Sequence, residues 1–162
     1  MPSSLKRRPD VTPSGNLGET RIHDVIGYQV AQAAIATLGI FDREVGGEMD
    51  LRPVEYTVLA LIEDNPGVTG ARLARALAVT APNIVMWLSR LEKRALVRRE
   101  TGSTDRRTQT LRTTAAGSKL AARATQRLVQ RERETLHLSE AERAMLIELL
   151  SKVARAREPR SA

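Results

Sequence analysis

Basic side chains are the most conspicuous chemical feature of this 162-residue chain, and they gather in one stretch. Residues 70–113 contain ten basic and three acidic side chains, whereas the rest of the chain contains 16 of each. The whole formal charge of +7 therefore lies in this stretch. Guanidinium and ammonium groups that bind phosphate release its counterions, which gives salt-sensitive binding to nucleic acid. The ten basic residues are Arg72, Arg75, Arg90, Lys93, Arg94, Arg98, Arg99, Arg106, Arg107 and Arg112.

Side chains suited to catalysis or metal binding are few. The chain has two histidines, His23 and His137, no cysteine, and no glycine-rich phosphate loop of the usual spacing. Neither histidine has a second one four residues away, the spacing that binds zinc on a helix. The lack of cysteine excludes disulfides and thiolate sites and fits a reducing compartment. We therefore expect no enzyme, no cofactor and no metal, in a cytoplasmic protein.

A membrane, the other polyanionic surface that attracts basic proteins, is not favoured by the sequence. The longest stretch without a formal charge, residues 25–41, contains Gln29 and Gln32. It is also shorter than the ~20 apolar residues of a typical transmembrane helix. The basic cluster at residues 6–8 has no apolar run behind it, so we expect no secretory signal.

The basic stretch lies on a predicted helix-turn-helix. Pro53 suits the first turn of a helix that ends at the turn 65–67. Thr69 is expected to cap a short second helix, and Thr80 a third one with Pro82 in its first turn. Two short helices with a tight connection form a helix-turn-helix when the second has an apolar stripe. That stripe is expected to consist of Ile84, Leu88 and Leu91.

A small hairpin is predicted next. Residues 97–101 and 109–112 are two short segments on either side of the polar stretch 102–108. This arrangement favours a β-hairpin. The fold class is therefore mainly α with a small β-hairpin wing (α+β), a winged helix-turn-helix.

Long apolar helices flank this unit, at about 21–47 and within 114–157. The last of them starts at the capping box formed by Ser139 and Glu142. The N-terminal helix is apolar on nearly every side, so it needs cover that a partner subunit would supply. We expect a homodimer joined by these helices. Residues 21–162 are read as a single domain with the winged lobe at about 52–113.

The first 20 residues are predicted to form a flexible arm. They contain Pro2, Pro9 and Pro13 with few large apolar groups, and such a segment cannot offset its ordering entropy by burial.

Three short motifs carry a family resemblance: LEKRALVRR at 91–99, DRR at 105–107 and TAAG at 114–117. With them the chain resembles the MarR family of bacterial transcription regulators over about residues 22–155. The resemblance implies a homodimer of winged lobes on double-stranded DNA. The second helix of each motif would enter the major groove, and the wing would reach the adjacent minor groove.

The same resemblance assigns roles to individual residues. Arg106 is the expected minor-groove arginine, and Asp105 with Arg107 braces the wing beside the DNA. The alternative is that these three charges only solvate a hairpin tip. The recognition helix should span about 81–94. Its candidate DNA-facing residues are Thr80, Ala81, Asn83, Met86 and Arg90.

Two residues depart from the family pattern. Met86 stands where a basic residue is frequent, which weakens guanine readout and favours A·T-rich sequence and shape. Ala95 replaces a frequent glycine after the recognition helix, so its C-cap is expected to differ from the usual one. Trp87 is expected in the core rather than stacked on a base.

Family members commonly respond to small anionic or aromatic compounds held between the dimer helices and the lobe. An aromatic acid or its thioester is the implied effector here. The candidate contacts are His23, Tyr28 and Tyr56, with Arg52 or Arg72 as carboxylate partners. The alternative places the histidine at a helix start and the tyrosines in the core.

The sequence thus favours a repressor that binds a roughly palindromic operator and releases it when a small molecule binds. Two alternatives remain open. One is an architectural DNA-binding protein without a ligand, and the other is a helical interaction module whose basic face binds an acidic partner.

Overall fold

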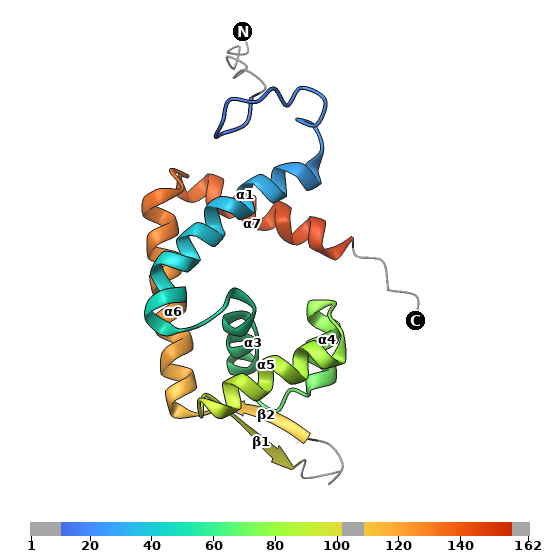
Figure 1. Ribbon diagram of the computed structural model, residues 1–162, viewed down its shortest axis with the longest axis vertical. Coiled ribbons are helices and arrows are strands. Elements are labelled where there is room, and N and C mark those ends of the chain that lie inside the picture. The colour runs from blue at the N-terminus through green and yellow to red at the C-terminus, as the bar shows by residue number, and fades with distance from the viewer. Residues whose placement is uncertain (1–10, 102–108, 157–162) are drawn as a thin grey trace.

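The computed structural model describes residues 11–101 and 109–156, arranged as a winged lobe and a helical arm (Figure 1). The fold is mainly helical with one two-stranded antiparallel sheet, as predicted. Its elements are α1 (Ile26–Phe41), a π-helical turn η1 (Asp42–Gly46), α2 (Gly47–Met49), α3 (Pro53–Asp64), α4 (Gly70–Leu77), α5 (Ala81–Lys93), β1 (Val97–Thr101), β2 (Gln109–Thr113), α6 (Ala115–Thr135) and α7 (Glu140–Arg155). No helix in the described ranges is long and apolar enough to span a bilayer.

The core of the lobe lies between α3, α4, α5, β2 and the first half of α6. Ile84, Leu88 and Leu91 are buried on the inner side of α5, as predicted. On α3 the buried apolar positions are Val58, Leu59 and Ile62. Each large apolar side chain that is fully removed from water contributes about 1.5–3 kcal/mol, so this cluster dominates the stability of the lobe.

The wing is attached to the lobe by more than its own hairpin. β1 pairs with β2 in a register that places Val97 opposite Thr113. The chain after α3 adds a third segment, because Leu111 N–H donates to Val68 O at 2.9 Å and Gly67 N–H donates to Leu111 O at 2.9 Å. Gly67 has φ +89°, a conformation that favours glycine. The base of the wing is thereby fixed beside the start of α4.

Alanines occupy the left-handed positions at both ends of the recognition helix α5. Ala78, in the turn between α4 and α5, has φ +53°, and Ala95, after α5, has the same value. At the second site Ala95 N–H donates to Glu92 O (2.8 Å) and Leu96 N–H donates to Leu91 O (2.9 Å). This is the Schellman pattern that usually ends on glycine. The expectation of an altered C-cap is therefore wrong: the usual bonds form, and the alanine adopts the strained conformation.

Replacing Ala95 by glycine should stabilise the protein by about 0.5–1 kcal/mol. Relief of the left-handed strain, about 1–2 kcal/mol, exceeds the added freedom of glycine in the unfolded chain. The change is measured as a shift of the urea midpoint at constant slope. Ala122→Gly, at an exposed position within α6, is the matched control and should cost about 1 kcal/mol. An A95G variant that is no more stable than the wild type would contradict the strain argument.

Helix α6 leaves the lobe and runs to the arm (Figure 1). It starts at Thr114, whose side chain accepts from Gly117 N–H and donates to Ala95 O at 2.7 Å. Gly117 packs against the backbone at Leu96 so closely that a Cβ on it would lie 2.0 Å from the carbonyl oxygen. Further along, α6 packs on α1 and η1.

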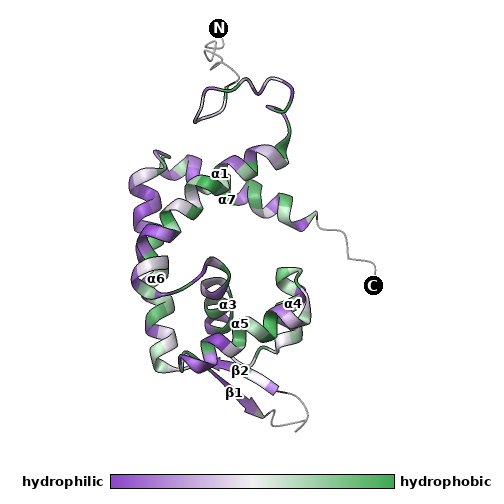
Figure 2. Cartoon of the chain, in the orientation of Figure 1, coloured by the Kyte–Doolittle hydropathy of each residue, from purple (hydrophilic) through white to green (hydrophobic). Residues whose placement is uncertain are grey.

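The arm consists of α1, α7 and the last part of α6. Every residue of α7 is exposed or half-buried, and large apolar side chains lie uncovered along both α1 and α7. Figure 2 shows hydrophobic segments on both helices. A groove of about 820 Å³ between them is lined by Ile26, Val30, Leu146, Leu149 and Leu150, among others.

Residues 11–20, which were predicted to be part of a flexible N-terminal segment separate from this helical arm, make defined contacts. Val11 forms an antiparallel bridge with Gly18, and Glu19 is buried. The Glu19 carboxylate accepts hydrogen bonds from Tyr28 and His23, which compensates the cost of its burial. Helix α1 begins at Ile26, directly after this segment and a turn. Residues 1–10 lie outside the described part of the chain.

Candidate nucleic-acid interface

The outer side of α5 carries most of the residues that the sequence assigned to DNA. Thr80 takes the N-cap position, although its hydroxyl makes no capping bond, and Pro82 lies in the first turn. Thr80, Ala81, Asn83 and Met86 are all exposed. Because a helix turns by about 100° per residue, Met86 lies on the side of α5 opposite the buried residues Ile84 and Leu88. This side of the helix is open to solvent. Contact between these residues and DNA remains a prediction.

Arg90, whose side chain is 40% exposed, differs from these residues because it pairs with a buried carboxylate. Its Nε atom lies 3.0 Å from Oε1 of Glu55, and the Glu55 side chain is only 2% exposed. The other carboxylate oxygen accepts from Arg52 N–H at 3.1 Å, at the start of α3. Oε1 has no hydrogen bond of good geometry in the described part of the chain, so the charge of Arg90 is what compensates it. Arg90 thus bridges α5 and α3, and its contact with DNA stays a prediction.

A second arginine fixes the other end of α5. Arg94 donates to the carbonyl oxygens of Met49, at 2.9 Å, and Asp50, and its Nη1 atom lies 3.7 Å from the Asp50 carboxylate. Asp50 has φ +48° at the end of α2. Both arginines therefore set the position of the recognition helix relative to the segment that enters the lobe.

The remaining basic residues of the lobe divide into paired and unpaired groups. Arg98 and Arg112 both reach Glu100 at 2.8 Å, and Arg99 pairs with Glu92 at 2.5 Å. By contrast, three exposed cations on α4 and α5 have no ion pair among the described residues: Arg72, Arg75 and Lys93. Paired arginines keep their charge but lose conformational freedom, so these three are the cations of the helix-turn-helix best able to bind phosphate. The wing residues Asp105, Arg106 and Arg107 lie outside the described residues.

The residues suggested for an effector fall in separate places. Tyr28 donates to Glu19 at 2.5 Å, and this bond to a carboxylate raises the pKa of the tyrosine. His23 Nδ1 lies 3.3 Å from the same glutamate and borders the groove between α1 and α7. Tyr56 bonds to Thr125 at 2.8 Å, where its ring meets that of Phe41.

The two arginines of that set are exposed. Arg52 sits at the start of α3, and Arg72 sits on α4. The structure therefore brings His23 and Tyr28 together but leaves the other three apart from them. In the described ranges no group of three or more His, Cys, Asp or Glu side chains could hold a metal ion.

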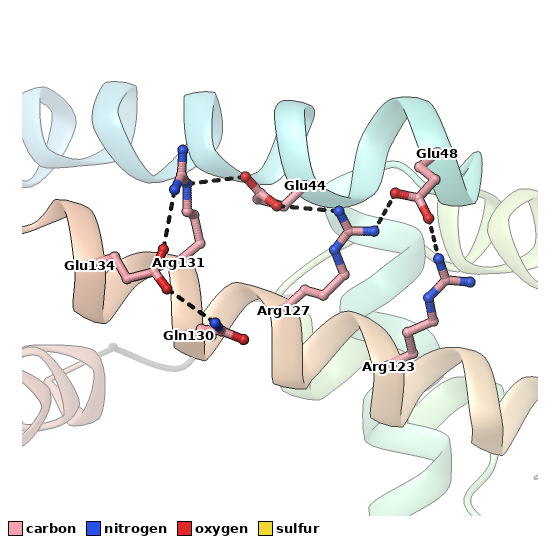
Figure 3. Close-up of polar contacts among 7 residues, drawn as sticks. All are labelled: Glu44, Glu48, Arg123, Arg127, Gln130, Arg131 and Glu134. Carbon is pink, nitrogen blue, oxygen red and sulfur yellow. Dashed lines mark hydrogen bonds and ion pairs between the residues drawn. The ribbon is translucent and has the colours of Figure 1, made fainter.

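A ladder of ion pairs that was not predicted from the sequence joins η1 and α2 to α6 (Figure 3). Glu44, in η1, lies 3.2 Å from Arg131 and 3.4 Å from Arg127. Glu48, in α2, binds both Arg127 and Arg123, and its pKa is lowered chiefly by the hydrogen bond from Arg127. The four-residue spacing of these arginines and glutamates was a signal that could have revealed the ladder.

Comparison with known proteins gives consistent similarities. A family model described as MarR family matches residues 49–108. A protein of Thauera aromatica assigned as the transcriptional regulator of the hcr operon is 33% identical over 131 residues, 80% of this chain and 79% of that protein. The repressor CouR bound to a 23-mer DNA duplex has 29% identity and a TM-score of 0.76, covering 85% of this chain and 98% of CouR. PcaV of Streptomyces coelicolor with its natural ligand has 22% identity and a TM-score of 0.72, covering 88% and 100%.

Proposed function

The chain belongs to the MarR family of winged helix-turn-helix transcription regulators, and on this basis we propose that it is a ligand-released repressor acting as a homodimer on a pseudo-palindromic operator. That it is a DNA-binding regulator rather than an enzyme follows from the family. The observation that best supports the proposal is the charge of the lobe, +7 over residues 70–113, next to an open face of α5. A regulator of chromosomal genes would act in the cytoplasm.

The case for a second copy of the chain comes from the arm. Exposed apolar residues recur along α7, with Leu146 42% and Leu150 44% exposed, and along α1, with Val30 41% exposed. A contiguous apolar face of this extent marks an interaction surface. Two lobes joined in this way would contact half-sites about one helical turn apart, which matches a palindromic operator.

For the effector we propose a small aromatic or anionic compound at the junction of arm and lobe. PcaV, which shares the fold, was solved with its natural ligand, so the fold can hold one. Tyr56 and Arg52 lie at this junction, at the start of α3. His23 and Tyr28 on the arm and Arg72 on α4 remain further candidates. Screening metabolites for release of the bound operator tests this step.

Arg106→Ala should weaken operator binding about tenfold, because one arginine is lost from the narrow minor groove. The operator is first selected from a random DNA pool, and affinity is then measured by band-shift titration at moderate salt. CouR, a relative seen on a DNA duplex, supports this use of the lobe. Arg133→Ala, at an exposed position of α6 far from the wing, is the control and should bind normally. Unchanged affinity of R106A would refute the wing assignment, and equal binding of random duplex would favour an architectural protein.

Charges placed on α7 should separate the subunits. The double variant Leu146→Glu, Leu150→Glu puts two carboxylates on the apolar side that borders α1, and burying them unpaired in an interface is costly. Sedimentation should show a monomer for this variant and a dimer for the wild type. Glu148→Gln, an exposed change on the same helix, should leave the dimer intact. A stable dimer of the double variant would show that α7 is not part of the interface.

A further inference from the structure

The lobe exposes two large apolar side chains on its recognition helix. Val85 is 55% and Met86 50% exposed, whereas the other large hydrophobic residues that are exposed in the described ranges belong to the N-terminal segment, α1 or α7. The apolar surface of the arm is accounted for by the proposed dimer. Val85 and Met86 lie on a different part of the molecule, and they need their own explanation.

These two residues belong to a largely carbon surface at the start of α5. One turn earlier lie Ala81, below Val85, and Pro82, below Met86, and both are exposed. Asn83 supplies the one side-chain amide among residues 81–86. One turn later, the guanidinium of Arg90 is paired with Glu55 at 3.0 Å. The surface formed by residues 81–86 is therefore apolar apart from the side-chain amide of Asn83.

Nothing in the described lobe covers the Val85 side. Val85 and Ala81 border a groove of about 410 Å³ that opens between α5, the start of α4 at Gly70, and the base of the wing at Gln109. The unpaired cations Arg72, Arg75 and Lys93 lie on the two helices of the motif. A ligand that matches this surface is therefore a polyanion that carries an apolar group at the position facing the start of α5.

DNA has one apolar group in its major groove, the C5-methyl of thymine. We propose that Val85 and Met86 are specificity-determining residues that read the methyl groups of neighbouring thymines in each half-site. This proposal rests on the proposed function, because it names what the recognition helix selects once it lies on an operator. Cytosine presents an amino donor and no methyl group at that edge, so these side chains discriminate against it.

The test uses the full-length protein and the operator that it selects from a random pool. Each thymine of the half-site is replaced in turn by deoxyuridine, which removes the methyl group and keeps the base pair. At the contacted positions the affinity should fall about fourfold for each methyl, the factor that corresponds to about 0.8 kcal/mol per buried carbon. Replacing a contacted thymine–adenine pair by 5-methylcytosine–guanine should retain more affinity than replacing it by cytosine–guanine.

Variants connect this effect to the two side chains. Val85→Ala and Met86→Ala should still bind the operator, but the ratio of affinities for thymine and deoxyuridine duplexes should fall towards one. Lys93→Ala is the matched control: it should weaken binding to both duplexes equally and leave the ratio unchanged. Equal binding of thymine and deoxyuridine operators by the wild type would overturn the proposal while leaving the regulator function intact. Two results would overturn both this proposal and the proposed regulator function. One is that the protein binds no sequence more tightly than random DNA, and the other is that it binds an acidic peptide and not DNA.

Discussion

Gly117→Ala should abolish stable folding of the lobe, with a loss of more than about 3 kcal/mol. The added methyl group would lie 2.0 Å from the carbonyl oxygen of Leu96 and 2.9 Å from its carbonyl carbon. Neither side can move away cheaply. Leu96 O accepts from Thr114 N–H at 3.0 Å, and Leu96 N–H closes the end of α5. The clash therefore disrupts the end of α5, the first strand and the start of α6 together.

Urea unfolding followed by circular dichroism measures this loss. Gly47→Ala, in α2, is the matched control, because a Cβ there meets no atom within 4 Å and its backbone is helical. Alanine at 47 should be neutral or stabilising by up to about 1 kcal/mol. A G117A variant within 1 kcal/mol of the wild type would mean that α6 does not approach the strand this closely.

Arg90→Ala should destabilise the protein by about 3 kcal/mol, because it leaves the buried Glu55 carboxylate without its cation. The two measurements are the free energy of unfolding and the affinity for DNA. Lys93→Ala removes an exposed cation from the same helix and should change stability by less than about 0.5 kcal/mol. If R90A is as stable as K93A and loses only DNA affinity, Arg90 acts on DNA and the bridge to α3 is wrong.

A double variant separates the lost ion pair from lost packing. Glu55→Gln combined with Arg90→Ala removes the unpaired buried charge, while an amide of similar shape still accepts from Arg52 N–H. It should recover most of the stability that R90A loses, because the penalty comes from the isolated charge. Additive losses in the double variant would show that Glu55 and Arg90 are energetically independent.

Local patterns predicted the elements of the lobe well because the cause of each is local. The inward positions of α5 follow from helical spacing, the caps at Thr69 and Ser139 from side-chain chemistry, and the hairpin from two short segments around a polar stretch. Ala95 shows where local rules end. The Schellman bonds form without glycine, because the hairpin and α6 that follow fix the path of the chain.

Pairing across long separations could not be read in the same way. Arg90 looks like an outward cation on α5, and its partner is a glutamate 35 positions earlier that the sequence marks only as an ordinary helix start. Glu19 is similar, since a carboxylate among turn residues gives no sign that Tyr28 will bury it. The candidate effector residues scatter for the same reason: residue type indicates what each could bind, but tertiary packing decides which of them meet.

The length of α6 also has a mechanical consequence. As one helix of 21 residues it reaches from the wing to the arm, about 31 Å at 1.5 Å per residue, with no break along its course. Because the helix is continuous, a small rotation at its arm end moves its wing end by a larger distance. A tilt of only about 6° at the arm end displaces the lobe by about 3 Å, close to the 3.4 Å step between base pairs. In the proposed dimer, a change of about 6° in the angle between the subunits would therefore be enough to shift a lobe by about one base pair along the DNA.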